Sequence, residues 1–303
     1  MNIADLKTFE AVARHGSMNK AASELNTVQS NVTVRIRALE DALGMPLFQR
    51  HARGVTPTPA GQRVLPFVGR LTRLMAEVKS AALDEGRPSG ALSLGSLETT
   101  MAMRLSPLLV EFSGTYPDVQ LVVTPGTTAR LVQDVVASRL DGAFVAGPVS
   151  HPELLQELMF SEELVLVTSP ATGTLKALKE LPELKTISFQ LGCSYRQRLE
   201  SFLADAGIVV SRRLEFGSLD AIVSCVSAGI GVSLLPQRVV QAAADAGMVR
   251  LIALPRAQAK VATLFVRRRD SYVSSALTAF LAMTRRVHAT PGKRAAKPRK
   301  RPA

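Results

Sequence analysis

A group of polar side chains near the N-terminus has the chemistry and spacing to contact DNA bases. The sequence predicts a helix over residues 28–43, where apolar residues recur at helical spacing on one face: Val32, Ile36, Leu39 and Leu43. The other face carries the polar residues Gln29, Ser30, Thr33 and Arg37, with Arg35 at its edge. Gln pairs with adenine, Arg pairs with guanine, and Thr contacts a thymine methyl group or a phosphate. This face therefore suits the major groove of DNA.

A shorter helix, predicted over residues 18–25, would position the polar helix. Small and apolar residues lie on one of its faces and let a second helix approach closely. Asn26 and Thr27 supply the turn, with Thr27 as the expected N-cap. Another helix, over residues 3–14, is expected to pack on this pair. An ordinary amphipathic helix pair with a solvated polar face would show the same pattern, so the spacing alone leaves both interpretations open.

A basic hairpin is predicted next, over residues 47–58, with its turn at residues 52–54. Arg50, His51 and Arg53 lie in this segment. Beside a helix that enters the groove, we expect them to contact phosphates or the minor groove. A solvated basic loop is the alternative.

Several motifs in this region follow one another in the order found in LysR-type transcriptional regulators. They are F-x-x-V-x-x-x-G-S at Phe9–Ser17, A-A-x-x-L at Ala21–Leu25, Gln29-Ser30, I-R-x-L-E at Ile36–Glu40, L-G-x-P-L-F-x-R at Leu43–Arg50 and T-P-A-G at Thr58–Gly61. The first fifth of the chain thus resembles the N-terminal domain of that family. The resemblance implies a winged helix-turn-helix domain over residues 1–58 in a sequence-specific DNA-binding transcriptional regulator.

A long helix is predicted from residue 59 to residue 83, followed by a hinge-like GRPSG segment, so residues 59–89 form the expected linker. Its apolar residues repeat in steps of four and three: Val64, Val68, Leu71, Met75, Val78 and Ala82. These residues form an apolar seam along the helix, and packing onto its own domain is one way to bury it. The resemblance favours pairing with a second copy, and it implies a homodimer through this helix and a homotetramer of such chains.

Residues 90–288 are expected to form a two-lobed α/β domain, because short apolar runs alternate with helical stretches and predict largely parallel sheets. This half resembles the effector-binding domain of LysR-type regulators, which looks like a type 2 periplasmic binding protein. The resemblance places lobe 1 at about residues 90–168 and 264–288, and lobe 2 at about residues 169–263. It also implies a small-molecule effector between the lobes.

Three predicted loops lie where parallel strands end and helices begin, which is where ligands bind in such sheets. Their candidate ligand-binding residues are Ser96, Thr99, Thr100, Thr127, Thr128, Ser194, Tyr195 and Arg196. Arg196 suits a carboxylate, so a small organic anion is the expected effector, although Glu98 among the donors opposes an anion. For each loop, helix capping alone is the alternative.

Composition limits the remaining possibilities. The net charge of +12 lies mostly at the C-terminus, where residues 284–303 hold eight Lys or Arg and no acid. Residues 289–303 are expected to be a disordered basic tail that adds nonspecific DNA affinity or solubility. No apolar run long enough for a membrane span and no secretory signal occur, which predicts a cytoplasmic, nucleoid-associated protein.

No catalytic or cofactor motif stands out. The sequence has no Walker loop, GxGxxG, GxSxG or HExxH, so neither an enzyme nor a cofactor or metal site is expected. A solute-binding or enzymatic α/β domain fused to the DNA-binding module is the alternative function. Cys193 and Cys225 have no metal-ligand spacing; they are expected to be buried small side chains, with a redox pair as the alternative.

Overall fold

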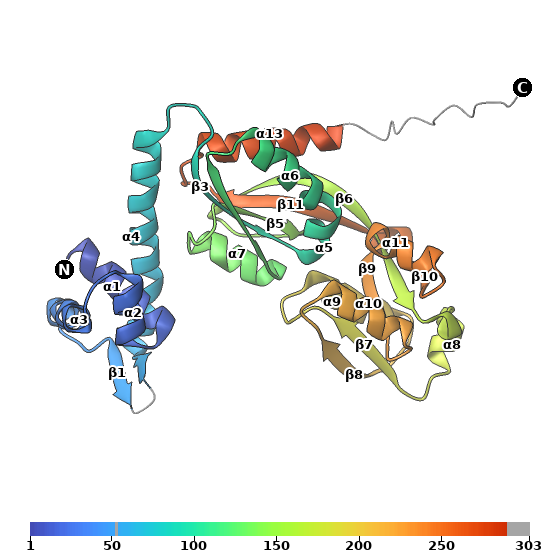
Figure 1. Ribbon diagram of the computed structural model, residues 1–303. Helices are drawn as coiled ribbons and strands as arrows, with labels where there is room; N and C mark the ends of the chain where they lie inside the picture. Colours follow the sequence, from blue (N-terminus) through green and yellow to red (C-terminus); the bar gives the residue numbers. More distant parts are fainter. Residues whose placement is uncertain (52–53, 290–303) are drawn as a thin grey trace, which may run out of the picture. The chain divides into compact units, whose positions relative to one another are not determined.

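The computed structural model describes residues 1–51 and 54–289 and divides the chain into two compact units (Figure 1). The first unit holds residues 1–83 and the short segment Ala137–Arg139, and the second unit begins at Asp84. Each unit has a hydrophobic core of its own. Within the described residues, no helix is both long and apolar enough to cross a membrane.

Three helices form the core of the first unit: α1 (Ile3–His15), α2 (Met18–Glu24) and α3 (Gln29–Leu43). They bury apolar residues that include Phe9, Val12, Ala21, Val32 and Ile36. The predicted N-cap of α3 is wrong by one residue. Val28 is the cap residue and its side chain makes no cap bond, whereas the Thr27 hydroxyl accepts a hydrogen bond from the Asn31 amide at 2.9 Å.

A two-stranded antiparallel wing follows, made of β1 (Phe48–His51) and β2 (Gly54–Pro57). The carboxylate of Glu40 on α3 accepts hydrogen bonds from the backbone N–H groups of Leu47, at 2.7 Å, and Phe48, at 3.2 Å. Because these bonds attach the start of β1 to α3, the wing is held beside the helix that carries the polar face.

The long helix α4 (Pro59–Leu83) begins at the T-P-A-G motif. The Thr58 hydroxyl accepts a hydrogen bond from the Gly61 N–H at 3.0 Å and so caps its first turn. A Cβ atom at Gly61 would lie 2.2 Å from the Leu47 carbonyl oxygen, so only glycine fits there. Val68 packs into the unit's own core, while the helix exposes Phe67, Leu71, Leu74, Met75 and Val78.

The second unit is built on a mixed sheet in the order β10-β6-β11-β5-β3-β4, with β9 also paired to β6. Its strands are β3 (Gly90–Ser96), β4 (Val119–Pro125), β5 (Gly142–Ala146), β6 (Leu154–Thr168), β9 (Ser233–Pro236), β10 (Arg250–Ala253) and β11 (Lys260–Arg268). β3 lies parallel to β4 and β5, whereas β11 lies antiparallel to β5 and β6. The expectation of largely parallel sheets therefore holds for only part of this sheet.

Strand β6 belongs to both lobes. Its first part, Leu154–Glu163, pairs with β11, and its last part, Leu164–Thr168, pairs with β9 and β10. The chain thus crosses between the lobes inside a continuous strand, a few residues before the boundary predicted at about residue 169, and it returns where β11 begins at Lys260, a few residues before the boundary predicted at about residue 264. An unbroken strand leaves no turn signal in the sequence, which is why the predicted boundary is late.

Helices cover both faces of the lobe 1 sheet. They are α5 (Glu98–Thr100), the π-helix η1 (Met101–Leu105), α6 (Ser106–Thr115), α7 (Thr128–Val136) and α13 (Ser275–Ala289). α6 and α13 lie on one face and α7 on the other (Figure 1). Under α6 and α13, the rings of Phe112, Phe144, Phe265 and Phe280 pack together, with Phe112 and Phe280 edge to face at 5.1 Å.

Lobe 2 has a parallel pair of strands, β7 (Leu184–Ser188) and β8 (Val210–Glu215), and an isolated bridge joins Thr186 on β7 to Val232, the residue before β9. Its helices are α8 (Leu175–Lys179), α9 (Ser194–Asp205), α10 (Leu219–Ser227), α11 (Gln237–Asp245) and α12 (Arg256–Ala259), with a short 3₁₀ turn η2 (Pro170–Thr172). α9 packs into one core cluster, and α10 and α11 pack into another. α8 and α12 are too short to show helical periodicity and were not predicted.

Candidate functional site

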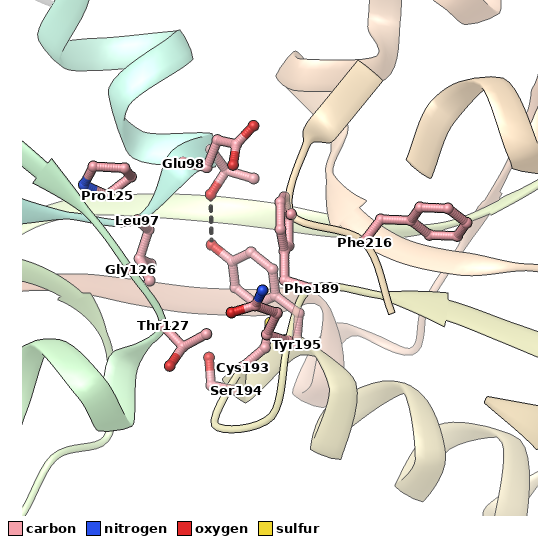
Figure 2. A pocket seen from close by; sticks show the side chains of 13 residues that line it. Leu97, Glu98, Pro125, Gly126, Thr127, Phe189, Cys193, Ser194, Tyr195 and Phe216 are labelled. Carbon is pink, nitrogen blue, oxygen red and sulfur yellow. Dashed lines mark hydrogen bonds between the residues drawn. The ribbon is translucent and has the colours of Figure 1, made fainter. Parts of the chain in front are cut away.

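A cavity of about 170 Å³ lies between the two lobes (Figure 2). Lobe 1 contributes residues that follow β3, namely Leu97, Glu98 and Thr99, and residues at the end of β4, namely Pro125, Gly126 and Thr127. Lobe 2 contributes residues just after β7 and β8 and at the start of α9: Phe189, Gln190, Cys193, Ser194, Tyr195, Phe216 and Gly217. The parallel pairs β3–β4 and β7–β8 direct their C-terminal ends toward the same space, as open α/β sheets do around a ligand.

One side-chain contact crosses the cavity. The hydroxyls of Thr99 and Tyr195 lie 3.4 Å apart, and both residues are buried (Figure 2). Burial raises the pKa of Tyr195 to about 12, which outweighs the lowering effect of the Thr99 hydrogen bond. The phenol therefore keeps its proton at neutral pH and can act as a donor.

Hydrogen bonds to backbone groups also join the lobes. The Leu219 N–H, at the start of α10, donates to the Glu98 carboxylate at 2.8 Å. The Thr127 hydroxyl donates to the Leu191 carbonyl, and the Ala129 N–H donates to the Gly192 carbonyl, both at 3.4 Å. These three bonds join the two lobes beside the cavity.

The structure brings four of the eight predicted ligand-binding residues to the cavity: Thr99, Thr127, Ser194 and Tyr195. The other four do not line it. Ser96 and Thr100 are buried, and the Ser96 hydroxyl donates to the Leu97 carbonyl at 2.9 Å. The Thr128 hydroxyl accepts from the Ala146 N–H at 3.2 Å, which ties α7 to β5.

The position of Arg196 matters most among these four residues, because the prediction of an anionic effector depended on its guanidinium. Its guanidinium donates to Glu200, one helical turn along α9, at 3.3 Å and also to Glu215 on β8. The pKa of Arg196 is raised, chiefly by the hydrogen bond to Glu215. Its charge is therefore already neutralised outside the cavity.

Sequence reasoning missed several apolar lining residues, among them Leu97, Pro125, Phe189 and Phe216. Phe189 and Phe216 are the first residues after β7 and β8. Their place after the ends of parallel strands is the signal that could have found them.

Cys193 also lines the cavity. Burial raises the pKa of its thiol, against the opposing effect of the Arg196 and Tyr195 N–H groups at the start of α9. Its reactive thiolate form is therefore disfavoured. Cys225 is only partly buried, against another core cluster, so the expectation of a buried side chain holds for Cys193 alone; both cysteines are free. The redox alternative gains no support from this arrangement.

The polar face of α3 is the second candidate site. Gln29, Ser30 and Arg37 are exposed, and Thr33 is half-buried with its hydroxyl 3.1 Å from the Gln29 amide. Arg50 is exposed on the wing. Ser30 and Thr33 thus accompany Gln29 at the N-terminal part of the helix, which is the part that contacts bases in helix-turn-helix proteins.

Arg35 departs from this face. Its guanidinium lies 3.4 Å from Asp5, a buried residue that forms the capping box of α1 with Asn2. Arg35 therefore stabilises the junction of α1 and α3. Arg53 and the predicted basic tail beyond Ala289 lie outside the described residues. Across residues 1–51 and 54–289, no group of three or more His, Cys, Asp or Glu could hold a metal ion.

Comparison with known proteins decides the family. Residues 3–62 match the model of the bacterial regulatory helix-turn-helix protein, lysR family, and residues 85–289 match the LysR substrate binding domain. The chain belongs to the LysR family of transcriptional regulators. The predicted family and fold class, a winged helix-turn-helix unit joined to a two-lobed α/β domain, are thereby confirmed.

Relatives of this LysR-family chain are similar over almost their whole length. The transcriptional regulator GltR of Bacillus subtilis is 40% identical over 285 residues, which cover 94% of this chain and 96% of GltR. The regulator CzcR of Bacillus anthracis is 38% identical over 288 residues, covering 95% and 98%. Full-length CbnR, solved in complex with its target DNA, is 25% identical with a TM-score of 0.65, covering 94% and 99%.

These relatives fix the function at the level of the family. The chain is a DNA-binding transcriptional regulator with an effector-binding domain, and it is a regulator rather than an enzyme, as predicted. The fused enzymatic or solute-binding domain is therefore no longer needed as an alternative.

Proposed function

We propose that a small organic molecule binds the cavity between the lobes and changes how this regulator acts on promoter DNA. The observation that carries the proposal is the convergence of Thr99, Thr127, Ser194 and Tyr195 on one cavity, although the sequence separates them into three loops. If these residues served only as helix caps, there would be no reason for them to meet at one cavity. The proposed function needs no cofactor.

Size and bonding favour a compact effector. A cavity of about 150 Å³ in another protein binds benzene, so one of about 170 Å³ fits a molecule of roughly one ring. The hydroxyls of Thr127 and Ser194 and the Gln190 amide can form hydrogen bonds with it, while Leu97 and Phe189 supply apolar walls. The anionic effector expected from Arg196 loses its main support, because that guanidinium pairs with Glu200 and Glu215.

An effector acts only if it binds two states of the regulator unequally. The bonds Glu98–Leu219 and Tyr195–Thr99 join the lobes beside the cavity. A ligand that competes with these bonds, or adds to them, favours one arrangement of the lobes over another. The bonds between the lobes therefore give a ligand a reason to bind the two states with different affinities.

We further propose that the chain forms a homodimer through α4. Leu71, Met75 and Val78 of the predicted seam are 45–57% exposed, and Phe67 and Leu74 enlarge the apolar surface. Val64 and Val68 pack within their own unit, so only the later part of the seam remains for a partner. A dimer would present two copies of α3 to a two-fold DNA site. The homotetramer expected from the family resemblance stays a separate proposal, which a mass measurement in solution decides.

The DNA contacts proposed for this chain are Gln29, Ser30, Thr33, Arg37 and Arg50, with Arg53 retained from the sequence alone. Arg35 is removed from the set because of its contact with Asp5. Sequence preference comes from the α3 residues, since base edges carry the sequence information, whereas Arg50 and Arg53 add phosphate contacts.

A mobility-shift titration on the DNA beside the protein's own gene tests effector control, using metabolites that raise the melting temperature of the purified protein. We expect Thr99→Val and Ser194→Ala to abolish the metabolite's effect while operator affinity changes by only a few fold. Thr115→Val, which removes a hydroxyl at the end of α6 that does not line the cavity, serves as the matched control. A normal response in both cavity variants would reject the proposed site.

A further inference from the structure

The charge around the cavity gives information about its ligand. Of the thirteen side chains that line it, all within the described residues, Glu98 is the one carboxylate, and none is Lys, Arg or His. One Glu98 oxygen accepts the Leu219 N–H at 2.8 Å. A carboxylate has about four acceptor positions, so Glu98 can bind a further donor without giving up this bond.

Nearby arginines do not balance this charge. Arg196 is paired with Glu200 and Glu215. Arg198 donates to the carbonyls of Gly147, at 3.2 Å, and Lys260, at 3.4 Å. Arg104 pairs with the buried carboxylate of Glu162 at 2.7 Å. In the described part of the chain, Glu98 forms no salt bridge, and the cavity therefore carries a negative charge.

The walls suit a cation as well. The side chain of Phe189 lines the cavity together with the ring of Tyr195, whereas the Phe216 ring points away from them (Figure 2). Aromatic faces attract ammonium groups, and the attraction strengthens where water is excluded. A carboxylate at the same place would be repelled by Glu98, with no lining cation to compensate.

We infer that the effector carries a protonated amine, which binds Glu98, on a compact apolar body of about one ring that packs against Phe189. This inference rests on the proposed function, because it assigns the chemical class of the ligand for the same cavity. It reverses the sign of charge expected from the sequence. The amine donates to the carboxylate, and the hydroxyls of Thr127 and Ser194 remain for neutral polar groups on the ligand.

Three probes of one skeleton test the charge: benzylamine, benzyl alcohol and benzoate, each titrated by calorimetry and by thermal shift up to about 10 mM to detect weak binding. We expect the full-length protein to bind benzylamine at least about tenfold more tightly than benzyl alcohol, since a charged partner strengthens the hydrogen bond, and to bind benzoate least.

The variant Glu98→Gln isolates the carboxylate charge. Its side-chain oxygen can still accept the Leu219 N–H, so the contact between lobes is retained. We expect this variant to lose the preference for benzylamine over benzyl alcohol while its affinity for benzyl alcohol changes little. Glu180→Gln is the matched control, because it removes one exposed negative charge that does not line the cavity, and it should leave the preference intact.

The outcomes separate the two proposals. Binding of benzoate in preference to benzylamine would overturn the amine inference and leave effector control in place. An equal preference for benzylamine in Glu98→Gln and in the unmodified protein would also overturn it. If none of the three probes binds, the inferred class of ligand is rejected. The proposed function would still be tested by the effect of metabolites on DNA binding.

Discussion

The phenol of Tyr195, on the first turn of α9, lies 3.4 Å from the hydroxyl of Thr99 on the opposite lobe. Both residues are almost fully buried. The pair therefore forms a polar contact between the lobes inside an otherwise largely apolar environment, where a lost partner is costly.

Removing the phenol oxygen should weaken this contact. Tyr195→Phe keeps the ring but leaves the Thr99 hydroxyl without its partner, and we expect a loss of about 1 kcal/mol in the free energy of unfolding. Urea denaturation measures the change. Thr99→Ser, which keeps a hydroxyl, should lose less. A Tyr195→Phe protein as stable as the unmodified one would show that the 3.4 Å contact contributes nothing.

Base recognition should depend on Gln29. Gln29→Ala removes an exposed amide at the start of α3, and we expect the preference for operator over random duplex to fall by about 1–3 kcal/mol, the usual contribution of a bidentate base contact. Competition titrations at one fixed salt concentration measure it. Gln120→Ala, an exposed amide on β4 in the other unit, is the control. Equal loss for operator and random DNA would assign Gln29 to the phosphates instead.

Arg35 should behave differently from its neighbours on α3. Arg35→Ala leaves the buried Asp5 carboxylate without this partner, so we expect the first unit to unfold at lower urea concentration. Arg37→Ala should instead weaken DNA binding with little change in stability, because Arg37 is exposed. Comparing urea midpoints with operator affinities for both variants distinguishes the roles. Intact stability in Arg35→Ala would return this residue to the DNA-contacting set.

Assembly should depend on the apolar surface of α4. Met75→Glu puts a charge into a region that also includes Leu71 and Leu74, and we expect the dimer to dissociate to monomers. Sedimentation velocity over a range of concentrations detects this. Val209→Glu, at a position 86% exposed in the other unit, should not alter the assembly. If Met75→Glu sediments like the unmodified protein, α4 is not the interface.

Acid should release the start of α13. Asp84 accepts the Ser275 N–H at 2.7 Å, and this bond is the main reason that its pKa falls from 3.8 to about 2. Because the folded-state pKa is below the unfolded value, the stabilising effect is complete above about pH 4 and is lost as the pH falls toward 2. Asp84→Asn should lower the melting temperature at pH 7, and the difference from the unmodified protein should shrink below pH 4. A constant difference at all pH values would contradict this.

Sequence patterns predicted the architecture well where local signals are strong. The steps Val32, Ile36 and Leu39 defined α3, and the spacing of the apolar runs located most strands of the second unit. Long-range partners were not predictable in this way. The residues around Arg196 in the sequence do not show that Glu215, on β8, is its partner. Likewise, the residues around Arg35 do not show that Asp5 lies beside it. Both arginines were therefore assigned to ligands rather than to internal partners.

The shared strand β6 limits the motions open to the effector-binding domain. Because one unbroken backbone runs through both lobes and is paired on each side, a sliding motion would require its ladder bonds to break and re-form. Bending or twisting near Glu163 and Leu164 keeps those bonds. A molecule of one ring is small compared with a lobe. A slight angular change at this pivot would nevertheless move the far ends of the domain by a much larger distance. A small ligand could in this way cause movements as large as those needed to change contacts with a DNA site.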